Sequence, residues 1–129
     1  LKEKVVFKNY MSKDVLEKKL SFGKVFILCD VNQIGGGNLI PGKFYHYLSY
    51  KIPIIAFSSL NSDTYNIINE TKSGNVFDFS NEIDLKNHIL ELYSNFKNGN
   101  CSLNINDIEK YKYSNLSSEL QSVIKKTSN

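Results

Sequence analysis

Apolar runs predict the strands. Residues 24–31, KVFILCDV, form a continuous run rich in β-branched and aromatic side chains, the pattern of a strand buried on both faces in a parallel sheet. Residues 52–57, IPIIAF, predict the next strand, with Pro53 near its start, where a missing N–H costs least. Two shorter runs, at 5–7 and 75–79, predict two further strands, so about four are expected.

Helical periodicity separates these strands. Residues 12–22 predict a helix that Ser12 caps and Gly23 stops. The next helix is expected to begin at Pro41 or Gly42, because proline is well tolerated in the first turn of a helix.

Three more helices follow along the chain. One is expected from about Ser62, capped by Ser62 or Asn61 and stopped by Gly74. Residues 80–99 carry one apolar face that is expected to be buried, made by Leu85, Ile89, Leu92, Tyr93 and Phe96. Residues 113–126 predict a last helix with the same spacing, made by Leu116, Leu120, Val123 and Ile124.

The alternation of about four strands with about five helices predicts an α/β fold. Such a pattern favours a parallel sheet with right-handed crossovers and helices on both faces. The 129 residues allow one domain at most, so 1–129 is expected to be a single unit. No apolar run approaches the roughly 20 residues that a membrane-spanning helix needs.

Charge and cysteine patterns argue against two classes of function. The chain has 16 lysines and no arginine against 13 acidic residues, a net charge of +3. Nucleic-acid sites rely on arginine for bidentate contacts, and these lysines are scattered among acids, so no nucleic-acid partner is expected. Cys29 and Cys101 have neither CxxC spacing nor a nearby histidine, so two free thiols are expected and no metal site.

The stretch GGGNLIPGKF, residues 35–44, predicts a phosphate site. In an open parallel sheet, ligands bind beyond the carboxyl ends of the strands, where loops lead into helix N-termini. A helix that begins near Gly42 offers unpaired N–H groups and the positive end of its dipole, and Lys43 adds a charge. The alternative is that the three glycines are only a connection and Pro41-Gly42 a plain helix start.

Two nucleotide-binding motifs fit this stretch incompletely. GNLIPGKF matches G-x-x-x-x-G-K, but Phe44 stands where a hydroxyl should hold magnesium, and the strand ends several residues before Gly37. The dinucleotide fingerprint G-x-G-x-x-G fails because position 40 is not glycine.

Residues 40–77 resemble a known enzyme family. The segment IPGKFYHYLSYKIPIIAFSSLNSDTYNIINETKSGNVF is similar to the nucleotide-sugar-binding half of GT-B glycosyltransferases, particularly the retaining group-4-like enzymes that build capsular and other surface polysaccharides. The opening segment also resembles the family, so the similarity covers about residues 4–125. The matching positions are Ile40, Pro41, Lys43, Phe44, Tyr47, Leu48, Lys51, Pro53, Ile54, Ile55, Ala56, Asp63, Ile67, Ile68, Glu70, Ser73 and Gly74.

The resemblance implies a fold and a task. The fold would be the Rossmann-like C-terminal half of a GT-B enzyme, a three-layer domain that lacks its first β-α unit and the N-terminal acceptor domain. The task would be to hold a nucleoside diphosphate sugar, such as a UDP-sugar, for transfer to a glycan or lipid-linked acceptor, without a required metal or other cofactor. The resemblance implies a cytoplasmic enzyme that can attach to the inner membrane face at full length, and a chain that is inactive alone.

The resemblance also implies substrate-binding residues, but no catalytic ones. Gly42 and Lys43 would meet the diphosphate beside Pro41, together with the backbone N–H of Phe44. His46 would face the ribose and Asn38, with the glycines, the sugar. The family has acids at these last two positions, and the exchange leaves a histidine and an amide to bind hydroxyl groups.

Two alternative functions remain open at this stage. One is a receiver-like signalling module in which Asp30, at a strand end, accepts phosphate; the other is half of a sugar-nucleotide epimerase. His46 is also read as a surface or core-edge residue, and His88 as solvent-facing. Of the three tyrosines close to His46, one or two are expected to pack into the core: Tyr45, Tyr47 and Tyr50.

Overall fold

The computed structural model describes residues 4–30, 39–100 and 107–127. They form an α/β fold built on a parallel three-stranded sheet in the order β1-β2-β3. In register, Phe26 pairs with Ile54 and Ile54 with Gly74, so neighbouring strands begin level with each other. The strands are β1 (Phe26–Cys29), β2 (Ile54–Phe57) and β3 (Gly74–Phe77).

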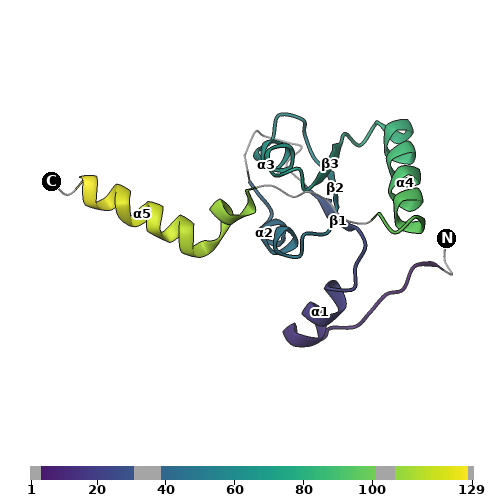
Figure 1. Ribbon diagram of the computed structural model, residues 1–129, viewed down its shortest axis with the longest axis horizontal. Coiled ribbons are helices and arrows are strands. Elements are labelled where there is room, and N and C mark those ends of the chain that lie inside the picture. The colour runs from purple at the N-terminus through teal and green to yellow at the C-terminus, as the bar shows by residue number, and fades with distance from the viewer. Residues whose placement is uncertain (1–3, 31–38, 101–106, 128–129) are drawn as a thin grey trace.

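Helices cover both faces of this sheet. Figure 1 shows α2 and α3 on one side of the strands, α4 on the other, and α5 extending away from the body. The helices on one side follow from topology, because two successive right-handed crossovers in the same direction place their helices on the same face. The helices are α1 (Lys13–Leu20), α2 (Gly42–Ser49), α3 (Asp63–Thr71), α4 (Glu82–Lys97) and α5 (Tyr113–Thr127), with a 3-10 turn, η2 (Ile108–Tyr111).

The core lies between the sheet and the α2–α3 layer. Phe44 and Leu48 of α2, four residues apart, point inward together, and both are buried. They belong to one cluster with apolar side chains of β1, β2 and α3: Phe26, Leu28, Ile54, Ala56, Ile67 and Ile68.

The expectation that the first long strand is buried on both faces is wrong. Along β1, burial alternates, and Ile27 is 60 % exposed while Leu28 is fully buried. β1 is an edge strand of the described sheet, and α4 leaves part of the second face open. β2, the central strand, is the one that buries consecutive residues.

The expected strand at 5–7 and the count of four strands are also wrong for the described residues. Val5, Val6 and Phe7 lie outside any strand, and Phe7 is 92 % exposed. Three apolar residues gain little by ordering unless a neighbouring strand accepts their hydrogen bonds, and none of the described strands does so.

The helices at 80–99 and 113–126 form as α4 and α5, but the expected burial of the α4 face is only partial: Leu85 and Leu92 are half-buried, and the other three residues of that face are exposed. Neither helix has a buried residue. Periodicity predicted which residues share a face and could not predict what covers it. None of the helices in the described part of the chain is both long and apolar enough to cross a bilayer.

Gly74 was expected to stop α3, but it is the first residue of β3. Lys72, in the left-handed region with φ 51°, ends the helix, and Ser62 caps its start by accepting a hydrogen bond from the N–H of Tyr65. Gly74 lies so close to β2 that an added Cβ would fall 1.9 Å from the carbonyl oxygen of Ile54.

We expect Gly74→Ala to destabilise the fold by about 3 kcal/mol or more, because the backbone of β2 has no room to move away. Gly42→Ala is the matched control. An added Cβ there meets nothing within 4 Å, so its free energy of unfolding should stay equal or rise by less than about 1 kcal/mol. Urea denaturation measures both, and equal midpoints for the two variants would contradict the close approach at Gly74.

Candidate functional site at the start of α2

The first turn of α2 lies at the carboxyl edge of the sheet. α2 links β1 to β2 and therefore runs back along the parallel strands, starting where β1 ends. It begins at Gly42 with Pro41 as N-cap, as the sequence predicted. Asn38 and the three glycines at 35–37 lie outside the described residues.

The amides of this turn are not all free. The N–H of Phe44, predicted to meet a diphosphate, donates to the carbonyl of Pro41 at 2.8 Å. That leaves Gly42 and Lys43, whose amides have no acceptor within the helix. The Pro41 side chain has no oxygen that could cap these two amides, and Gly42 and Lys43 are both exposed.

Gly42 is not required for packing. Among the described residues, nothing lies within 4 Å of the position that its Cβ would occupy, and its φ is not in the left-handed region. Since the fold does not need a glycine here, the bare backbone is available to an approaching ligand.

His46 lies on the same outward side of α2 as Gly42. Both are two residues from buried Phe44, about 200° around the helix axis from it. The His46 ring is exposed and packs edge-on against Tyr50 with centroids 5.2 Å apart, and its Nε2 lies 3.4 Å from the Tyr50 hydroxyl. The imidazole is thus accessible and lightly held.

A small pocket of about 280 Å³ joins this side of α2 to the C-terminal segment. It brings Gly42 and His46 together, whereas Lys43 lies outside its lining. The remaining lining residues are Tyr45, Leu48, Ser49, Ile108, Tyr111, Lys112 and Tyr113.

All three tyrosines near His46 are partly buried and pack against the core, where one or two were expected. Tyr47 stacks on Phe26 with ring centroids 4.5 Å apart, and Tyr50 meets the same ring edge-on at 5.7 Å. Tyr45 packs beside buried Phe44, with ring centroids 5.8 Å apart, and also near Tyr111, at 6.2 Å. Burial raises the pKa of the Tyr45 hydroxyl, with smaller contributions from Asp63 and Tyr113, so the hydroxyl keeps its proton at neutral pH.

A buried polar cluster that the sequence did not predict connects the elements at the carboxyl edge. The Asp30 carboxylate, just after β1, accepts hydrogen bonds from Ser58 Oγ at 2.9 Å and Thr64 Oγ1 at 3.3 Å. Ser58 uses its one proton for Asp30, so the Ser62 hydroxyl donates to Ser58 in their 2.8 Å contact. The cluster therefore joins the ends of β1 and β2 to the start of α3.

The same cluster argues against phosphate transfer to Asp30. Its side chain receives two hydroxyl donors, and the residue is only 3 % exposed. A phosphoacceptor carboxylate must be reached by a donor from solvent, so the receiver-like alternative loses support.

A second network, between residues about forty positions apart, holds η2 against α3. The Glu70 carboxylate accepts hydrogen bonds from Lys110 Nζ and, at 2.8 Å, from the Tyr111 hydroxyl. The Lys110 and then the Tyr111 hydrogen bond lower the pKa of Glu70, and the bond to Glu70 raises the pKa of Lys110. Burial, followed by the bond to Glu70, raises the pKa of Tyr111.

His88 is not solvent-facing, contrary to expectation. Its side chain is 16 % exposed, and its ring packs against Phe77 of β3 with centroids 5.5 Å apart. The charged neighbours along α4 hid the fact that this position faces the sheet.

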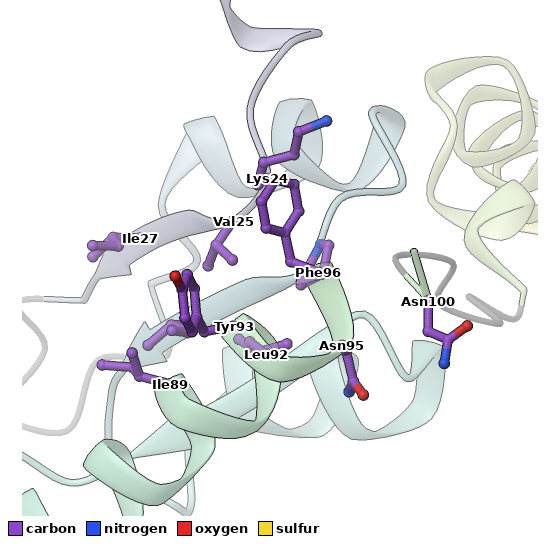
Figure 2. Close-up of a pocket in the computed structure, with 11 residues that line it drawn as sticks. Lys24, Val25, Ile27, Ile89, Leu92, Tyr93, Asn95, Phe96 and Asn100 are labelled. Carbon is purple, nitrogen blue, oxygen red and sulfur yellow. The ribbon is translucent and has the colours of Figure 1, made fainter. Parts of the chain in front are cut away.

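A larger hollow than the pocket beside α2 lies between α4 and the second face of the sheet. Figure 2 shows Ile89, Tyr93 and Phe96 of α4 opposite Val25 and Ile27. This groove, of about 500 Å³, is lined mainly by apolar side chains. The Lys24 ammonium, at the groove's edge, lies 5.8 Å from the centre of the Phe96 ring.

Comparison with family models, with curated proteins and with solved structures finds no match to this chain. The resemblance to glycosyltransferases therefore stays a prediction.

We expect the Glu70 network to make stability fall in acid. Glu70 has a lower pKa in the fold than its ordinary 4.5, so near and below that pH the unfolded chain binds more protons, and the free energy of unfolding decreases as the pH falls. Glu70→Gln should lower stability slightly at about pH 7 and weaken this acid dependence, whereas Glu119→Gln on α5 should change neither.

Chemical denaturation at about pH 7 and about pH 3 measures the effect. The same acid dependence in Glu70→Gln and in the unchanged chain would show that the Glu70 network does not form.

Proposed function

We propose that this chain binds the diphosphate of a nucleoside diphosphate sugar at the first turn of α2. The single observation that carries the proposal is the exposed start of α2 at the carboxyl edge of a parallel sheet, with an open approach at Gly42. Helix N-termini at this edge favour anions through their free amides and dipole.

Two amides and one ammonium group would form the binding site for the diphosphate, which is called the diphosphate seat below. The N–H groups of Gly42 and Lys43 point along the helix axis toward the ligand, and the exposed Lys43 side chain adds a positive charge. Pro41 supports the turn by accepting the hydrogen bond of Phe44, whose buried ring fixes the helix on the sheet. His46, one turn further on, would hydrogen-bond ribose hydroxyls.

Such a seat suits sugar transfer. When the bond between sugar and diphosphate breaks, negative charge builds on the leaving phosphate, and preorganised amides and a lysine stabilise that charge. We therefore propose a donor-binding, Rossmann-like domain of a GT-B glycosyltransferase that acts on a glycan or lipid-linked acceptor in surface polysaccharide synthesis. The acceptor, and any base that activates it, would be held by another domain.

The proposal is tested by titrating UDP and inorganic pyrophosphate into the chain and its variants. By itself the chain should bind with at most about millimolar affinity, a free energy near −4 kcal/mol. Lys43→Ala should lower the affinity for both ligands about tenfold, because one charge-assisted contact is lost. Gly42→Ala should weaken the binding of both ligands without lowering the free energy of unfolding, because its methyl group occupies the approach to the amides.

Lys86→Ala, which removes an exposed lysine on α4, is the matched control and should leave both affinities unchanged. If Lys43→Ala and Lys86→Ala bound pyrophosphate equally well, the diphosphate would not lie at α2.

A further inference from the structure

The pocket beside α2 has walls from two distant parts of the chain. One wall is the outward side of α2, with Gly42, His46 and Ser49; the other is the start of the C-terminal segment, with Tyr111 and Tyr113. From Gly42 to Ser49 the helix rises about 10 Å, so the pocket runs from the first turn of α2 along its length. A ligand held at the first turn can therefore extend into it.

The pocket has the size of part of a ligand. Sites that enclose a whole small molecule are about 300–1,000 Å³ in volume. At about 280 Å³, this pocket suits a flat ring and a pentose and is too small for a complete nucleotide sugar.

Its chemistry suits a nucleoside better than a second anion. Tyr45 and Tyr113 present aromatic rings, and Tyr113 is 85 % exposed, so its face is open for stacking. Among the described lining residues, the one lysine is Lys112, which is paired with Glu109 at 2.7 Å, and this pairing reduces its attraction for a phosphate. The His46 ring nitrogens and the Ser49 hydroxyl add polar atoms to the lining of the pocket.

The second wall is held in place by the fold. Tyr111 donates to Glu70 of α3 and its ring packs near Tyr45 of α2. Tyr113 follows two residues later as the first residue of α5. The backbone at Tyr113 is therefore placed beside the pocket before a ligand arrives, which removes part of the ordering cost of binding.

We propose that this pocket binds the nucleoside of the donor, with the base stacked on Tyr113 and the ribose beside His46. The inference rests on the proposed diphosphate seat at Gly42 and Lys43, and it assigns the C-terminal segment a direct role in nucleotide binding.

The test compares three ligands, UDP, uridine and inorganic pyrophosphate, by NMR titration of the full chain. Tyr113→Ala should weaken UDP about tenfold, the size expected for loss of one base–aromatic stack, and leave pyrophosphate unchanged. Tyr113→Phe keeps the ring and should bind UDP as the unchanged chain does. Tyr10→Ala, which removes a fully exposed tyrosine distant in sequence, is the matched control and should have no effect.

The outcomes separate this inference from the proposed function. If Lys43→Ala weakens UDP and Tyr113→Ala does not, the nucleoside lies elsewhere, and the inference is overturned while the diphosphate seat stands. If pyrophosphate fails to bind but uridine binds and Tyr113→Ala abolishes its binding, the pocket is correct and the seat is wrong. If none of the three ligands binds, both proposals fail.

Discussion

The packing of Phe44 and Leu48 against the sheet is the interaction on which the proposed site depends. With both side chains buried, α2 can have only one rotation about its axis, and Gly42 and His46 must face outward. The parallel order of β1 and β2 then fixes the direction of the helix and brings its first turn to the carboxyl edge. Hydrophobic packing thus orients two functional candidates that do not themselves contribute to the core.

Two polar networks complete this arrangement from either side. Asp30, Ser58, Ser62 and Thr64 hold together the strand ends and the start of α3 beneath the carboxyl edge. Because Asp30 is buried, each hydroxyl that donates to its carboxylate offsets part of the cost of burying that group. On the outer side, Glu70 binds Lys110 and Tyr111 and so determines where the C-terminal segment meets α2. The first network fixes the edge, and the second builds the far wall of the pocket.

The sequence was most informative where local chemistry decides structure. Pro41-Gly42 predicted the start of α2, and Ser62 was predicted as a cap of α3. Both predictions depend only on a few adjacent residues, because these determine first-turn geometry and capping. It misled where burial depends on distant partners. Residues 5–7 are apolar, but none of the described strands pairs with them. His88 lies among charged residues yet packs on Phe77, and Ile27 is exposed on an edge strand. The sequence also led to a wrong partner for the Phe44 amide, which was expected to bind a ligand. In the structure it donates to the carbonyl of Pro41, a hydrogen bond that can be recognised only from the backbone conformation. The wall formed by Tyr111 and Tyr113 could not be found from sequence, because about 65 residues separate it from α2.

The central claim is that a pyrophosphate group sits on the amides that begin α2. Recording backbone amide resonances of the isotopically labelled chain during a pyrophosphate titration tests it most directly, because the resonance of each N–H reports its own surroundings. The account predicts that the Gly42 and Lys43 amides shift most, while the amide of Phe44, already bonded to Pro41, shifts less. Largest shifts at the start of α3, or no shift in the first turn of α2, would contradict it.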